Sequence, residues 1–168
     1  MGTLTVDNLN LKNSGVVSSV GKVLSHKITQ ITANSTRASA TSYADDLDFG
    51  SFTPTSSNSI VLIQGIAHMD GVNSSAYVYY KWVVDGVDFL STGDSTPIAT
   101  HIFYNIHTNN NLCVMPSTIM TSVTNTDGSA IPVKCQGKVT TGTLSINRSH
   151  NASQAGSPST VIWTEIAT

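Results

Sequence analysis

Charged side chains are scarce in this 168-residue chain. Lys and Arg number 8 and Asp and Glu number 10, so 11% of the residues are charged and the formal net charge is −2. An ordinary soluble domain has about 25% charged residues. A nucleic-acid binder needs a basic patch against the phosphate backbone, so this composition excludes that class.

Long apolar segments are missing too. No apolar run approaches the roughly 20 residues of a membrane span. The first ten residues, MGTLTVDNLN, have neither the basic start nor the apolar stretch of a signal peptide. We therefore expect no membrane insertion and no secretory signal.

Helix-building residues and cysteines are few. Glutamate occurs once, at Glu165, and Lys and Arg are sparse. The two cysteines, Cys113 and Cys135, are too few for a disulfide framework, and their spacing matches no zinc pattern. Free buried thiols are expected, although a single bridge between the two stays open.

Catalytic and metal-binding motifs are absent from the sequence. It contains no GxSxG, GxxxxGK[ST], HExxH or GxGxxG. His101 and His107 are about 20 Å apart along a strand and cannot share one metal. Asp45, Asp46 and Asp48 match no calcium loop, and we interpret them as a solvated loop. The sequence predicts a non-enzyme with no catalytic residue, no metal site and no cofactor.

Hydroxyl and β-branched residues are abundant instead. The chain has 23 serines and 22 threonines, and Thr, Val, Ile and Tyr fit the pleated, half-buried surface of a strand. Short segments of alternating polarity are separated by turn signals about every ten residues. For residues 21–168 this predicts one all-β domain, an antiparallel β-sandwich or jelly roll of about eight to ten strands.

The strongest strand signals lie in the middle of the chain. Residues 60–69 are predicted as a central strand with both faces covered, which places Leu62 in the core. In residues 76–84, Tyr80 and Trp82 share the face expected to be core, whereas Tyr77 and Tyr79 point outward. The following Asp85-Gly86 predicts a two-residue hairpin. We expect a connector over 33–44 and further strands at 22–32, 98–106, 112–115, 119–124, 131–135, 139–147 and 160–167.

The first 20 residues form a segment of their own. Apolar residues alternate with polar ones in two phases around Asp7-Asn8, first Leu4 and Val6 and then Leu9 and Leu11. This segment has too little apolar surface to fold alone. We predict that residues 1–20 are an extended arm that docks on a neighbouring copy or a larger assembly, with a loose terminus as the alternative.

A set of motifs occurs in a distinctive order along the chain. These are GKVL, then TPTSSNS leading into IVLIQGIA, then YYKWVVDG, LSINRS and the closing STVIWTEIA. Together with the opening TLTVDNLNL they resemble a domain of tailed-bacteriophage virion proteins, particularly those of marine and cyanobacterial phages. That domain ends in a strand of the type S-T-[IV]-x-x-x-E-I, preceded by an INRS-like strand. The resemblance covers residues 21–167 and the arm.

The resemblance implies a β-sandwich in a trimeric fibre, spike or capsid-decorating protein, without catalytic residues. Because only residues 1–20 precede the domain, it favours a short appendage over a long fibre. The main hypothesis is a homotrimeric knob on the virion, assembled in the bacterial host cytoplasm. Residues 1–20 would hold it to capsid or tail proteins, and Tyr77 and Tyr79 would face a neighbouring subunit or a host surface glycan.

Two alternatives to this hypothesis stay open. The first is a capsid decoration protein that stabilises the shell. The second is a monomeric carbohydrate-binding module. Neither involves a nucleic-acid partner, and the placement on tail or capsid stays open.

Overall fold

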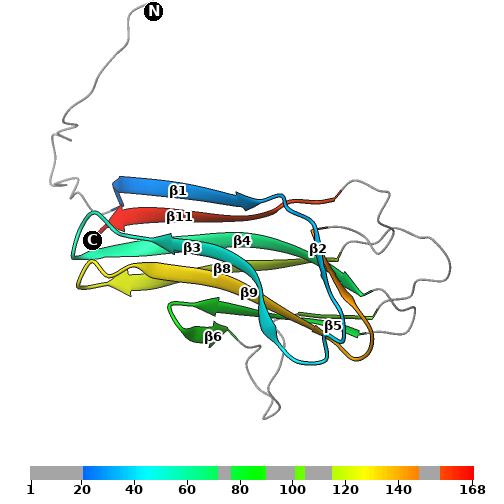
Figure 1. The fold of residues 1–168 in the computed structure, drawn as a ribbon. Helices are drawn as coiled ribbons and strands as arrows, with labels where there is room; N and C mark the ends of the chain where they lie inside the picture. Colours follow the sequence, from blue (N-terminus) through cyan, green and yellow to red (C-terminus); the bar gives the residue numbers. More distant parts are fainter. Residues whose placement is uncertain (1–20, 72–76, 90–100, 105–114, 148–155) are drawn as a thin grey trace, which may run out of the picture.

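The structure is a computed structural model that describes residues 21–71, 77–89, 101–104, 115–147 and 156–168. Within these residues, all of the regular secondary structure is β-strand. This confirms the predicted all-β class. The described strands, shown in Figure 1, are β1 (Val23–Ile31), β2 (Ser35–Arg37), β3 (Ala44–Phe52), β4 (Ser59–Gly71), β5 (Tyr77–Val84), β6 (Val87–Phe89), β7 (His101–Tyr104), β8 (Met115–Asn125), β9 (Ile131–Val139), β10 (Leu144–Ile146) and β11 (Ser159–Ala167).

Two antiparallel sheets pack face to face as a sandwich (Figure 1). The six-stranded sheet has the order β1-β11-β4-β10-β2, and β8 pairs with the other edge of β4. The five-stranded sheet has the order β3-β9-β5-β6, and β7 also pairs with β5. The predicted β-sandwich is therefore correct.

The strands pair in a nested order along the chain. β1 pairs with β11, β3 with β9, β4 with β8, and β5 with β6 and β7. The first long strand thus meets the last one, and the second meets the last but one. This nesting is the jelly-roll arrangement, in which one long antiparallel hairpin wraps over two sheets.

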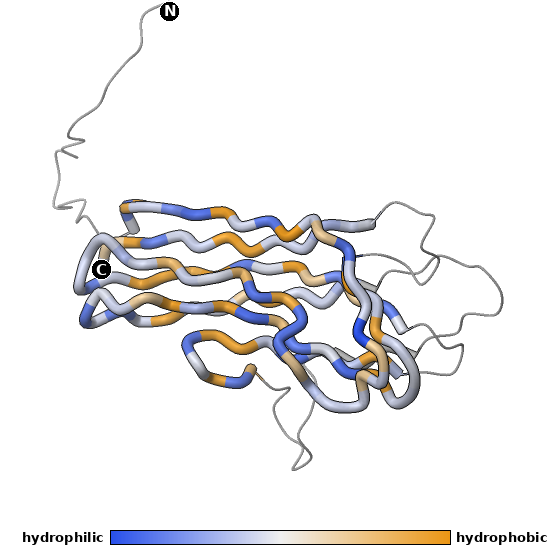
Figure 2. Tube along the Cα trace, viewed as in Figure 1, coloured by the Kyte–Doolittle hydropathy of each residue, from blue (hydrophilic) through white to orange (hydrophobic). Residues whose placement is uncertain are grey.

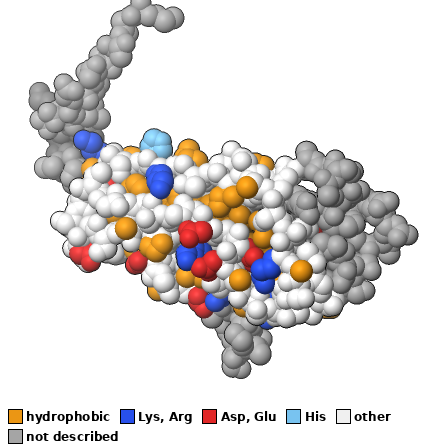
Figure 3. All heavy atoms as spheres, in the orientation of Figure 1, with side chains coloured by type: hydrophobic (Ala, Val, Ile, Leu, Met, Phe, Trp, Pro, Cys, Tyr) orange, Lys and Arg blue, Asp and Glu red, His pale blue; other side chains and the backbone are white. Residues whose placement is uncertain are grey.

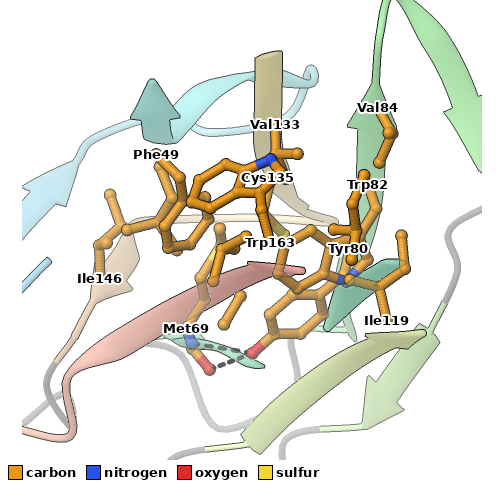
Figure 4. Packing of buried hydrophobic residues seen from close by; sticks show 14 of the residues in the cluster. Phe49, Met69, Tyr80, Trp82, Val84, Ile119, Val133, Cys135, Ile146 and Trp163 are labelled. Carbon is orange, nitrogen blue, oxygen red and sulfur yellow. Dashed lines mark hydrogen bonds between the residues drawn. The ribbon is translucent and has the colours of Figure 1, made fainter. Parts of the chain in front are cut away.

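The core lies between the sheets, and strands such as β5 and β9 contribute alternate residues to it. Figure 2 shows the hydropathy of the residues along these strands. On β5, Tyr80 and Trp82 have no exposed surface, as the alternation predicts. Phe49 of β3 stacks on Trp82 with 5.8 Å between the ring centroids. Figure 4 shows Tyr80 reaching the backbone of Met69, where its hydroxyl donates to the carbonyl at 2.6 Å and accepts from the N–H at 2.9 Å.

The turn after β5 fixes which of its residues face the core. Asp85 and Gly86 both have positive φ, 52° and 75°, and Val84 pairs directly with Val87. A two-residue turn with positive φ at both positions matches the twist of the strands that it joins. The predicted hairpin is confirmed, and it holds Trp82 on the inner face because a slip of one residue would reverse the strand.

The central strand β4 differs from the prediction in one respect. Only one face is covered by the other sheet: Val61 and Ile63 are fully buried, whereas Leu62 is 40% exposed. The core placement of Leu62 is wrong, because successive side chains point to opposite faces and its two neighbours occupy the inner one. An unbroken apolar run does not by itself distinguish a strand with one covered face from one with two.

The acidic residues Asp45, Asp46 and Asp48 lie on β3 and not in a solvated loop, so that interpretation is wrong. Asp is unfavourable in strands, but cations from neighbouring strands pair with each of these carboxylates. The pairing of β3 with β9 shifts register between Asp45 and Leu47 and again between Asp48 and Ser51. These irregularities interrupt the alternation that identifies a strand in the sequence.

Two shorter predictions also need correction. Pro116 does not separate two strands, since β8 runs unbroken from Met115 to Asn125. A proline is tolerated near the start of an edge strand, and β8 is an edge strand among those described. The predicted connector contains β2. The arm, with Leu4, Val6, Leu9 and Leu11, and the predicted strand residues 112–114 lie outside the described residues.

Candidate interaction faces

The outer faces of the two sheets differ in chemistry. The outward residues of β1, β11 and β8, and those of β4 from Ile60 to His68, form what we call the uncharged face, because they include no Lys, Arg, Asp or Glu. Asp70, further along β4, is buried and is not part of this face. The members of the face pair across the strands: His26, Ile28, Gln30, Thr160, Ile162, Thr164, Ile166, Ile60, Leu62, Gln64, Ile66, His68, Pro116, Thr118, Met120, Ser122 and Thr124.

Large apolar side chains stand exposed on the uncharged face. Met120 is 81% exposed, Ile28 is 59% exposed and Leu62 of β4 is 40% exposed. Ile162 and Gln64 lie between Ile28 and Met120 in the register of the four strands. A shallow hollow of about 320 Å³ opens beside Met120 and is lined by Gln64, Gly65, Ile66, Ile119, Thr160 and Ile162. The rest of the face carries Ser, Thr, Ile, His, Gln and Pro side chains, of which the hydroxyl side chains cost little conformational entropy to order.

The opposite face, formed outward from β3, β9 and β5, carries charge and tyrosine. Figure 3 shows lysine and acidic side chains gathered on this side of the molecule. Lys134 Nζ lies 2.6 Å from Asp45 and 3.8 Å from Asp48, and Lys81 Nζ lies 3.0 Å from Asp88. Each of these two lysines thus has a carboxylate partner.

Next to these pairs is a group that we call the tyrosine–lysine cluster: Tyr43, Tyr77, Tyr79, Lys81 and Lys138. The Lys138 ammonium lies 4.8 Å from the ring centroid of Tyr43 and 4.8 Å from that of Tyr79. Lys81 lies 5.2 Å from the Tyr43 ring, and the rings of Tyr77 and Tyr79 are 6.3 Å apart. Burial, with smaller contributions from Tyr79 and Asp88, raises the pKa of Tyr43 to about 12.

The cluster joins residues that no sequence motif connects. Register places Lys138 of β9 directly opposite Tyr79 of β5, and Tyr43 comes just before β3 on the other side of β9. The alternation of β5 predicted the outward Tyr77 and Tyr79, but it could not identify Tyr43 or Lys138. Only the pairing of three strands distant in sequence reveals the cluster.

The buried polar groups serve the fold. Glu165 has no exposed surface, and its carboxylate accepts hydrogen bonds from Ser25 Oγ, from the N–H and hydroxyl of Thr55 and from the Ser56 N–H. Burial opposes its ionisation, but these hydrogen bonds outweigh burial and lower the pKa of Glu165 to about 2. The only glutamate in the chain therefore fastens the loop between β3 and β4 to β11.

The described residues contain no candidate metal site. No three or more His, Cys, Asp or Glu side chains gather there as metal ligands would. Cys135 is a free thiol in the core, and burial raises its pKa, so the reactive thiolate is disfavoured. Cys113 lies outside the described residues. Within the described ranges, no helix has the length and hydropathy to cross a membrane.

Comparison of the chain with protein-family models and with curated proteins finds no match. The structure itself shows an antiparallel two-sheet domain with two outer faces of contrasting chemistry.

Proposed function

We propose that this chain is a non-enzymatic structural subunit of a bacteriophage virion, a short homotrimeric appendage knob. Neighbouring copies cover the uncharged face, the tyrosine–lysine cluster points away from the particle, and residues 1–20 join the knob to capsid or tail proteins. The observation that carries the proposal is the uncharged face itself, a surface across four strands of one sheet with exposed apolar side chains and no charge.

Interface cores are depleted of charged residues and enriched in apolar ones, Met included. Burying apolar surface stabilises an interface by about 25 cal/mol per Å². Met120 on β8, Ile28 on β1 and Leu62 on β4 offer such surface across the width of the face. No ion has to be desolvated when two such faces meet, so the favourable apolar contribution is not offset by the large cost of burying a charge.

Jelly rolls occur in viral capsid proteins, and also in lectins and cupins, so the fold alone does not choose a function. The ordered motifs from GKVL to STVIWTEIA direct the proposal toward a phage particle. The hydroxyl-rich, charge-poor composition fits a rigid appendage whose surface side chains lose little entropy on assembly.

Immunogold labelling of purified phage particles, with an antibody raised against residues 21–168, tests the proposal. We expect gold at the tail or its appendages. Label spread over the capsid shell would instead indicate a decoration protein. Particles that carry no label, although the chain is made in infected cells, would contradict a virion role.

Deletion of residues 1–20 tests the anchor separately. Since the described strands and their core lie within residues 21–168, we expect the shortened chain to fold. It should be missing from particles formed in its presence. Incorporation equal to that of the full chain would show that residues 1–20 are not the anchor.

A further inference from the structure

Lys138 differs from the other lysines on its face. Lys81 and Lys134 each lie within 3.0 Å of a carboxylate oxygen, whereas no carboxylate of the described residues lies at ion-pair distance from Lys138. Its ammonium rests instead between the rings of Tyr43 and Tyr79. The aromatic faces hold the charge in place without neutralising it.

Hydrogen-bonding groups at Lys138 have no carboxylate partner among the described residues. An ammonium group has three donors and no acceptor. The hydroxyl of Tyr43 is buried and has no hydrogen-bond partner among the described residues. A carboxylate placed beside Lys138 would accept charge-assisted hydrogen bonds from the ammonium.

An exposed aromatic surface adjoins the ammonium. Tyr77 is 42% exposed, and its ring lies 6.3 Å from that of Tyr79 at an interplanar angle of 41°. The electron-rich face of an aromatic ring attracts the weakly positive C–H groups of a sugar ring. The site therefore combines a sugar-stacking surface with a single unneutralised cation.

We propose that the tyrosine–lysine cluster binds an acidic sugar, a uronic or sialic acid residue of a surface glycan, with its ring on Tyr77 and its carboxylate at Lys138. A nucleic acid fits less well, because the lysines of this face are matched by Asp45, Asp48 and Asp88 and offer no basic patch to a polyanion. The inference deepens the proposed function, since it rests on this face being displayed outward.

A glycan array tests the inference, with each acidic oligosaccharide printed beside its carboxyl-reduced counterpart. We expect the full-length protein to bind at least one acidic member and to lose that binding on carboxyl reduction. Lys138→Gln should weaken binding about tenfold or more, the effect of one lost hydrogen bond to a charged group. Tyr77→Ala should weaken it as well, and Lys138→Arg should retain most of it.

Lys134→Gln is the matched control, because this lysine shares the face and the strand but is paired with Asp45. The affinity of Lys134→Gln for the acidic glycan should stay within about twofold of the wild-type affinity, a difference of well under the 1.4 kcal/mol that corresponds to a factor of ten. Absence of binding to every acidic glycan, equal binding of the reduced forms, equal losses in Lys134→Gln and Lys138→Gln, or preference for duplex DNA would overturn the inference.

Measuring the mass of the same protein sample separates this inference from the proposed function. If the protein is a trimer but binds no acidic glycan, the proposed sugar site is refuted and the proposed homotrimer is not. If the protein is a monomer but binds an acidic glycan, the proposed homotrimer is refuted and the proposed sugar site is not. The melting temperature of each variant shows whether a lost signal reflects unfolding.

Discussion

Gly65 of β4 lies directly against the ring of Trp82 from the facing sheet. A β-carbon built at Gly65 would come within 2.9 Å of Trp82 Cη2 and 3.0 Å of Ile119 Cγ2. Trp82 cannot move aside easily, since it is fully buried, stacks on Phe49 and donates a hydrogen bond from Nε1 to Ser117 Oγ at 2.9 Å. The glycine is what allows the indole to reach across the sandwich.

The first prediction concerns this contact. Gly65→Ala should lower the free energy of unfolding by about 1–3 kcal/mol, the usual cost of overpacking a core, even though alanine suits a strand no worse than glycine does. Ser122→Ala on the outer face is the control and should change it by less than about 0.5 kcal/mol. Urea denaturation measures both, and a stabilised Gly65→Ala would contradict the packing described.

The second prediction compares the two faces of β5. Trp82→Ala should cost about 3–5 kcal/mol, because it empties a large core site and removes the hydrogen bond from the indole to Ser117 Oγ. Tyr79→Ala should cost much less in the isolated subunit, since its ring is only partly buried. Thermal melting with the mass recorded alongside tests this, and a larger loss from Tyr79→Ala would mean that the faces are reversed.

The third prediction concerns acid. The pKa of Glu165 is about 2 in the folded chain and 4.5 as the ordinary value. The ionised carboxylate therefore stabilises the fold fully above about pH 4.5, and this contribution disappears as the pH falls toward 2. Glu165→Gln should be destabilised at pH 7 by about 1–3 kcal/mol, because donors lose their charged acceptor.

Urea denaturation at pH 7, 4 and 3 checks the Glu165 effect. The difference in the free energy of unfolding between the wild type and Glu165→Gln should become smaller as the pH falls. If this difference in the free energy of unfolding is the same at pH 3 as at pH 7, the charge of Glu165 is not what holds the loop between β3 and β4.

The fourth prediction concerns the ion pair between β2 and β3. Arg37 binds Asp46 through two nitrogens at 2.7 and 2.9 Å, and the Asp46 side chain is only 3% exposed. Arg37→Met should cost about 3–5 kcal/mol, because it leaves a buried carboxylate without its partner. Lys134→Met removes an exposed pair and should cost about 0–1 kcal/mol.

A double variant tests the cause of the Arg37 effect. Arg37→Met combined with Asp46→Leu removes both charges, so it should be more stable than Arg37→Met alone. If the double variant loses the sum of the two single losses, desolvation of Asp46 is not the reason.

Some of this architecture follows from sequence patterns, and some requires the fold. The alternation of β5 and the Asp85-Gly86 turn predict the inward Trp82, because both signals are local. β3 escapes detection, because its carboxylates are compensated by Arg37 and Lys134, which come from other strands. Leu62 is misplaced for a related reason, since composition cannot tell which face of an apolar strand is covered.

For the candidate sites too, features of a single strand can be predicted from the sequence, whereas features that join several strands cannot. The outward position of Tyr77 and Tyr79 is a property of one strand and could be predicted. The contact of Lys138 with Tyr43 depends on how β3, β9 and β5 are registered. The uncharged face depends in the same way on the pairing of β1, β11, β4 and β8. Both are consequences of long-range pairing, which no local pattern contains.

The oligomeric mass of the full-length chain and of two variants tests whether the uncharged face joins the subunits. Met120→Asp places a charge on the uncharged face, and Val87→Asp does so at a residue 60% exposed on β6 of the other sheet. By sedimentation at micromolar concentration, the wild type and Val87→Asp should have three times the 17.7 kDa chain mass, and Met120→Asp should be a monomer. A monomeric wild type, or a Met120→Asp trimer as stable as that of Val87→Asp, would contradict the proposal that this face joins the subunits.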